Sequence, residues 1–142
     1  MKMKRLTVVA LGIFTSLVVC QAVVAYPAAE KKAVNVANAW LALVDQGQYS
    51  KSWENAAAYF KAAVGKEQWQ TSLTAARKPF GKVLSRKLRS TQYATTLPGA
   101  PDGHYVVIQF QTSFERKSSA VETVTPMRDQ DGKWRVAGYY IR

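Results

Sequence analysis

The spacing of hydrophobic residues changes near residue 80 of this chain. Before that point apolar residues recur every three or four positions, which is typical of amphipathic helices. After it they alternate with polar residues, which is typical of strands. Helices followed by strands predict an α+β fold, with three N-terminal helices packed on one face of a four-stranded antiparallel sheet.

Three helices are predicted, over residues 30–45, from Ser50 or Ser52 to Val64, and over residues 66–78. A glycine or proline follows each of them within three residues, and these residue types end helices. Each predicted helix carries one tryptophan at an apolar position: Trp40, Trp53 and Trp69. Core packing is the expected role of these rings, and stacking on a sugar or cofactor is the alternative.

Four strands are predicted, over residues 82–96, 105–114, 120–128 and 133–141. A Leu-Pro-Gly-Ala-Pro-Asp-Gly segment separates the first two strands, and Asp131-Gly132 predicts a hairpin between the last two. Pro126 conflicts with the third strand because proline has no N–H to donate to a strand ladder. We therefore expect a bulge or an edge position there.

The first 25 residues have the pattern of a secretory signal peptide. Basic residues precede an uncharged apolar run, and small side chains follow it. Cleavage between Ala25 and Tyr26 would leave one domain at residues 26–142, in the periplasm or secreted. A membrane anchor is the alternative, but the apolar run is shorter than the ~20 residues that a bilayer requires.

Lipidation is a further possibility for the N-terminal segment. Cys20, the only cysteine, follows a Leu-Val-Val sequence that is similar to a lipobox. The residue before such a cysteine is normally small, and Val19 is bulky, which argues against a lipoprotein. Cleavage after Ala25 would leave a mature chain without cysteine, so its core would have to hold the domain together without disulfides.

Basic residues dominate the charge of the chain, which is +11 overall. No acidic residue occurs between Glu67 and Asp102. Six basic residues of this segment are candidates for anion binding: Arg77, Lys78, Lys82, Arg86, Lys87 and Arg89. On a strand, Lys87 and Arg89 would project to one face and Arg86 to the other, so they do not form a single stripe. Such a segment attracts anionic lipid head groups, cell-wall phosphates or an acidic protein partner, and a cationic surface that only aids solubility is the alternative. Nucleic acid is disfavoured as a partner, because an exported protein rarely meets it and no recognition motif is present.

Metal and nucleophilic chemistry find little support in the sequence. The single histidine, His104, follows a turn, and a chain without a mature cysteine cannot complete a closed zinc site around it. No nucleophile elbow or glycine-rich phosphate loop is present. We therefore expect no metal and no cofactor.

Acid–base chemistry is the remaining enzymatic possibility. Glu122 lies inside a predicted strand between apolar neighbours, and it could act in a sheet pocket beside the phenol of Tyr139 or Tyr140. The alternative is an ion pair between Glu122 and Arg86 or Arg135 across the outer face of the sheet.

Several short segments spread over the chain form a recognisable set. They are Ala39-Trp40-Leu41-Ala42-Leu43-Val44-Asp45, Gly47-x-Tyr49, Ser52-Trp53, Gln68-Trp69, Arg77-x-Pro79-x-Gly81, Ser85-Arg86, Leu97-Pro98-Gly99-Ala100-Pro101-Asp102-Gly103, Glu122-Thr123-Val124-Thr125 and Asp131-Gly132-x-Trp134-Arg135-Val136-x-Gly138-Tyr139. Together they resemble a family known only as domain of unknown function 4019.

The resemblance implies a small exported bacterial protein with a cystatin-like or nuclear-transport-factor-like (NTF2-like) fold. It implies no activity, and it assigns no catalytic residue. We therefore expect a non-catalytic binding or interaction module. A small acid–base enzyme with a sheet pocket is one alternative, and a cationic envelope protein that binds anionic surfaces is another.

Overall fold

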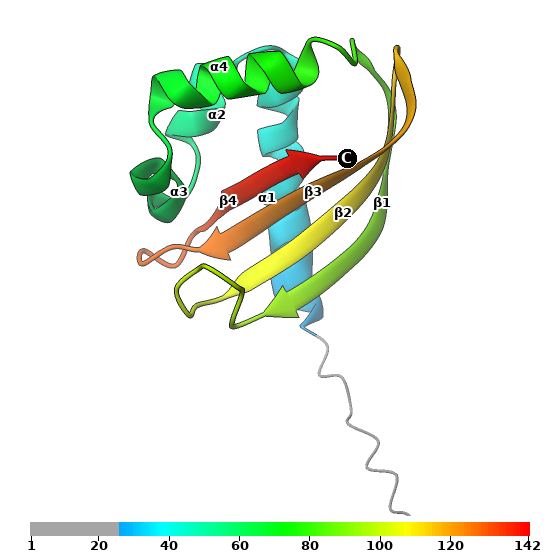
Figure 1. The fold of residues 1–142 in the computed structure, drawn as a ribbon. Helices are drawn as coiled ribbons and strands as arrows, with labels where there is room; N and C mark the ends of the chain where they lie inside the picture. Colours follow the sequence, from blue (N-terminus) through cyan, green and yellow to red (C-terminus); the bar gives the residue numbers. More distant parts are fainter. Residues whose placement is uncertain (1–25) are drawn as a thin grey trace, which may run out of the picture.

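The computed structural model describes residues 26–142, so the predicted signal peptide and Cys20 lie outside the described residues. Four helices come first: α1 (Pro27–Asp45), α2 (Tyr49–Glu54), α3 (Ala58–Ala63) and α4 (Lys66–Arg77). Four strands follow: β1 (Val83–Ala94), β2 (Tyr105–Phe114), β3 (Lys117–Arg128) and β4 (Trp134–Ile141) (Figure 1). The α+β architecture is as predicted. Within the described part of the chain, no helix has the length and apolar character needed to cross a membrane.

The four strands form one sheet in the order β1-β2-β3-β4, and every neighbouring pair is antiparallel. α1 crosses the sheet and contacts all four strands, and we call the face that it covers the inner face (Figure 1). Alternate side chains of β2 point to the inner face and are buried there: Val106, Ile108, Phe110, Thr112 and Phe114. The alternating pattern seen in the sequence therefore predicts this face correctly.

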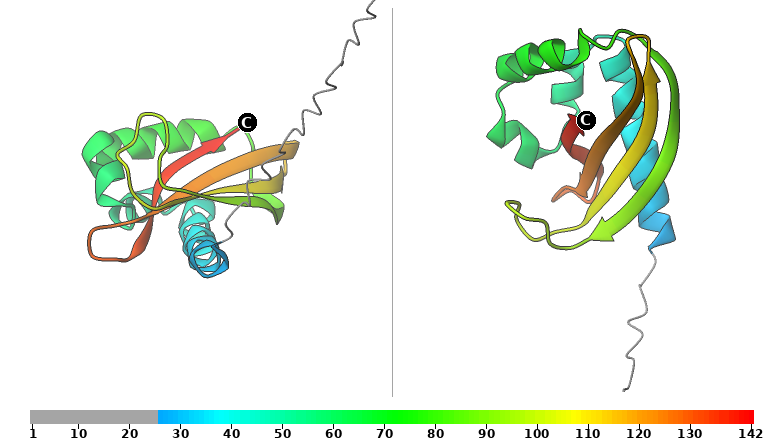
Figure 2. Two further views of the ribbon diagram at one scale, coloured as in Figure 1. Left: turned by 90° about the horizontal axis from the view of Figure 1, so that it is seen from below. Right: turned by 45° about the vertical axis from the view of Figure 1, so that its right-hand side comes forward.

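α1 supplies the other half of the core. Its buried side chains recur at helical spacing: Ala33, Ala37, Trp40, Leu41 and Val44. The indole N–H of Trp40 donates to the backbone carbonyl of Ser52 at 2.8 Å, so the polar atom of this buried ring has a partner. Helices α2, α3 and α4 gather on the β4 side of the sheet, as both views in Figure 2 agree.

The predicted second helix is wrong in one respect, because the chain forms two short helices in its place. α2 ends at Glu54 and α3 begins at Ala58. Between them, the backbone N–H of Ala57 donates to the carbonyl of Val136 in β4 at 2.8 Å. Ala57 has an extended conformation (ψ 150°), so this bond to the sheet interrupts the helix. A tertiary contact thus overrides local helix propensity.

The third strand accommodates Pro126 through a bulge. β3 lies between β2 and β4, so it is not an edge strand. The register with β4 shifts between Thr125 and Pro126. Of the two expectations for this proline, the bulge is confirmed.

β1 is an edge strand with two irregularities. Its register with β2 shifts once between Val83 and Ser85 and again between Leu88 and Ser90. Leu84 lies within the first shift and Leu88 borders the second, and the two residues are 66% and 53% exposed. These leucines therefore contribute little to the core.

Candidate functional site

Glu122, the acid singled out in the sequence, lies on the inner face of the sheet and has no exposed surface. Its Oε1 accepts hydrogen bonds from Arg86 Nε at 2.7 Å and from the Thr112 hydroxyl at 2.6 Å. Its Oε2 accepts a hydrogen bond from the phenol of Tyr139. Strands β1, β2 and β4 thus each supply one donor to this carboxylate on β3.

Both expected contacts of Glu122 occur, although not in the expected place. The carboxylate pairs with Arg86 and also lies beside Tyr139. The pair with Arg86 is on the inner face, because Arg86 is opposite Thr112 in the register. Of the alternatives given for this ion pair, Arg86 is the partner, but the outer face is wrong, and Arg135 binds Asp129 and Asp131 instead.

The ion pair extends to the helices through Asp45 at the end of α1. Arg86 donates to both oxygens of Asp45, at 2.7 and 3.0 Å. Arg77, on α4, donates to the same carboxylate at 3.0 Å. We call this set the polar cluster: Asp45, Arg77, Arg86, Thr112, Glu122 and Tyr139.

Burial and neighbouring charges act on two members of the polar cluster, Tyr139 and Arg86. Burial raises the pKa of the Tyr139 phenol, and the negative charge of Glu122 raises it further, so the phenol stays neutral and acts as a donor. Burial disfavours the charged form of Arg86, but hydrogen bonds to Asp45 and Glu122 outweigh this effect and raise its pKa. The phenol of Tyr139 and the guanidinium of Arg86 thus both donate to the Glu122 carboxylate.

The six basic residues named as candidates for anion binding lie in three places. Arg77 and Arg86 belong to the polar cluster, where carboxylates of the chain hold them. Lys78 and Lys82 are exposed and line a hollow near the end of α4, together with Arg77 and Asp45. Lys87 and Arg89 are exposed on β1.

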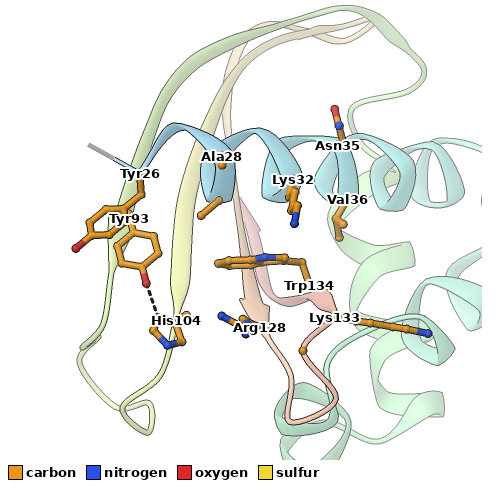
Figure 3. Close-up of a pocket in the computed structure, with 12 residues that line it drawn as sticks. Tyr26, Ala28, Lys32, Asn35, Val36, Tyr93, His104, Arg128, Lys133 and Trp134 are labelled. Carbon is orange, nitrogen blue, oxygen red and sulfur yellow. Dashed lines mark hydrogen bonds between the residues drawn. The ribbon is translucent and has the colours of Figure 1, made fainter. Parts of the chain in front are cut away.

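A larger groove lies between the N-terminal half of α1 and one end of the sheet (Figure 3). In an antiparallel meander the last residues of β1 and β3 lie beside the first residues of β2 and β4. This places Tyr93, Arg128 and Trp134 at the same end of the sheet. The groove has a volume of about 710 Å³ and is lined by Tyr26, Ala28, Ala29, Lys32, Asn35, Val36, Tyr93, His104, Arg128, Gly132, Lys133 and Trp134.

Aromatic side chains form much of the groove wall. Tyr26 stacks on Tyr93 with ring centroids 3.9 Å apart. The phenol of Tyr93 is hydrogen-bonded to Nδ1 of His104. Figure 3 shows the Trp134 ring between α1, which carries Lys32, and the side chain of Arg128. The groove therefore combines flat apolar surfaces with cationic groups.

In the described part of the chain, the three cations of the groove lie in no ion pair within 4 Å. Within residues 26–142, Lys32, Arg128 and Lys133 form no ion pair, and no Asp or Glu is among the residues that line the groove. Arg135 differs from them, because its hydrogen bond to Asp131 holds the pKa of that carboxyl down, to about 2. The groove cations are free to bind an anion from solution.

Sequence reasoning missed the groove because its cations come from separate elements. Lys32 is on α1, Arg128 ends β3, and Lys133 precedes β4. Each looks like an ordinary surface residue in the sequence. The only local signal was the adjacency of Lys133 and Trp134 after the predicted hairpin.

The fold and these two features define a class: a small α+β protein with a buried ionic cluster on its sheet and a basic aromatic groove beside its first helix. Residues 36–139 match the family model described as "Protein of unknown function (DUF4019)", and the chain belongs to this family. The resemblance noted in the sequence is thereby confirmed. The match includes Arg128, Lys133 and Trp134 and begins after Lys32. No curated protein matches the chain.

Proposed function

We propose that this protein is an exported, non-catalytic binding module that holds an anionic ligand in the groove beside α1. The observation that carries the proposal is the set of three cations, Lys32, Arg128 and Lys133, that form no ion pair within residues 26–142, in a groove that no Asp or Glu of this range lines. Export to the periplasm rests on the signal-peptide pattern of the first 25 residues. The long first helix on a four-stranded antiparallel sheet supports a cystatin-like or NTF2-like fold.

The state of Glu122 supports a binding role over acid–base catalysis. A general base must reach the proton that it abstracts, at hydrogen-bond distance or through one water. Glu122 has no exposed surface, and Arg86, Thr112 and Tyr139 already donate to its oxygens. A carboxylate held in this way stabilises the fold by joining strands.

Adhesion to anionic envelope surfaces through β1 is the second candidate function. Lys87 and Arg89 favour it, because both are exposed on the same edge strand. The two candidates place the bound anion at different sites, one between α1 and the sheet and the other on β1. Charge neutralisation at each site in turn separates them.

The test compares two double variants that remove the same charge. Lys32→Gln with Arg128→Gln neutralises the groove, and Lys87→Gln with Arg89→Gln is the matched control on β1. Retention on immobilised heparin is measured over a salt gradient, because electrostatic binding weakens as salt screens charges. If each groove cation contributes about 1 kcal/mol, the groove variant binds heparin roughly 30-fold more weakly.

We expect the β1 control to elute close to the wild-type protein. The groove proposal would be contradicted if both variants lost the same heparin affinity, or if the β1 variant lost more. A wild-type protein that heparin does not retain would also overturn it. Circular dichroism of each variant confirms that the fold is intact.

A further inference from the structure

The groove does not end at Trp134. A second hollow of about 450 Å³ continues along α1 and is lined by Val36, Ala39, Trp40, Leu43, Lys51, Asn55, Lys133, Trp134 and Arg135. It shares Val36, Lys133 and Trp134 with the groove. We call the groove and the second hollow together the channel.

Positive charge extends along the whole channel. The second hollow adds Lys51, from α2, which forms no ion pair within the described residues. Among the residues from Tyr26 onward, no Asp or Glu lines either part of the channel. In Figure 3 the Lys133 side chain points along α1, away from His104. Cations therefore occur at both ends and in the middle of the channel.

We propose that the channel binds an acidic polysaccharide, a linear polymer whose sugar units carry carboxylate or sulfate groups. This inference rests on the proposed function and extends it from an anionic ligand to a polymer several units long. Two connected hollows offer room for consecutive units, and the separated cations match charges that repeat along a chain. Trp134 lines both hollows, and its flat ring suits the apolar face of a sugar ring.

An acidic peptide fits the channel less well. One common way for an extended peptide to bind is to add a strand to a free sheet edge, where backbone hydrogen bonds supply the affinity. The edge of β4 next to the channel is already engaged at Val136, whose carbonyl accepts the N–H of Ala57 at 2.8 Å. Side chains therefore dominate what the channel offers, and these are aromatic rings and cations.

The experiment measures binding of oligogalacturonates of two and six units by titration calorimetry. For the wild-type protein we expect the six-unit chain to bind at least about tenfold more tightly than the two-unit chain, because it reaches both hollows. Lys51→Gln should remove most of this gain and leave binding of the two-unit chain unchanged. Lys87→Gln is the matched control, and it should alter neither affinity.

Other outcomes would overturn the inference and leave the proposed function standing. Equal affinity for the two lengths, or no effect of Lys51→Gln, would mean that the ligand occupies the groove alone. Tighter binding of hexaglutamate than of hexagalacturonate would identify an acidic peptide as the ligand. In each of these cases heparin retention that depends on Lys32 and Arg128 would still support an anion site. Trp134→Ala adds a second check, because loss of stacking should weaken both oligosaccharides.

Discussion

The guanidinium of Arg86 and the carboxylate of Glu122, 2.7 Å apart, form an ion pair on the hydrophobic face of the sheet. Moving two charges out of water costs free energy, which their attraction offsets only when the geometry is good and the remaining polar atoms have partners. Thr112, Tyr139 and Asp45 supply those partners here. The charged atoms of Arg86 and Glu122 therefore all have hydrogen-bond partners, which offsets the cost of burying them.

Removing one member of this pair should destabilise the fold strongly. In Arg86→Met the carboxylate of Glu122 stays buried and loses its cation, so we expect the free energy of unfolding to fall by about 3–5 kcal/mol. Urea denaturation measures this change. Lys87→Met, at the neighbouring exposed position, should change the free energy of unfolding by less than about 0.5 kcal/mol. If Arg86→Met lowered the free energy of unfolding by less than about 1 kcal/mol, the ion pair between Arg86 and Glu122 would have to be exposed to solvent.

Tyr139 should make stability depend on alkaline pH. Its pKa is higher in the folded protein than in the unfolded chain, where a tyrosine titrates near 10. Its contribution is therefore fully present below about pH 10 and is lost as pH rises further, because only the unfolded chain then gives up the proton. The free energy of unfolding, followed from pH 8 to 11, should fall less steeply in Tyr139→Phe. If the free energy of unfolding fell equally steeply with pH in the wild-type protein and in Tyr139→Phe, the buried hydrogen bond from Tyr139 to Glu122 would be contradicted.

Truncation of Trp40 on α1 should lower the free energy of unfolding more than truncation of Trp53 on α2. Trp40 is 3% exposed, and its ring packs against Trp69 and Tyr139. Trp40→Ala should lower the free energy of unfolding by about 3–5 kcal/mol, because it leaves a large cavity and an unpaired carbonyl at Ser52. Thermal and urea unfolding both report this loss. Trp53 is only half-buried, and an equal or larger loss for Trp53→Ala would refute this ranking.

Local patterns were sufficient to predict the strands and the end of the first helix. Alternation in residues 105–114 identifies the buried face of β2, and Gly47 follows α1 with a positive φ of 73°. The break between α2 and α3 was not predictable, because it depends on a hydrogen bond between Ala57 and a strand far along the chain. Helix propensity depends on the local sequence and does not include such a distant contact.

The candidate site was predictable only in part, for a similar reason. Glu122 stands out in the sequence as an acid between apolar neighbours, and both Arg86 and Tyr139 were named as its possible partners. That all three meet on one face depends on the registers of three strand pairs, which the sequence does not specify. Lys32 and Arg128 carry no local signal, because only the packing of α1 on the sheet brings them together.

The exposed edge of β1 bears on how copies of this protein behave at high concentration. A long edge strand with unpaired backbone groups and exposed leucines is a template for intermolecular pairing and aggregation. The two register shifts in β1 interrupt that template, and Lys87 and Arg89 on this strand would bring like charges together if two such edges met. Repulsion between these charges opposes pairing of two β1 edges, an effect that needs no ligand.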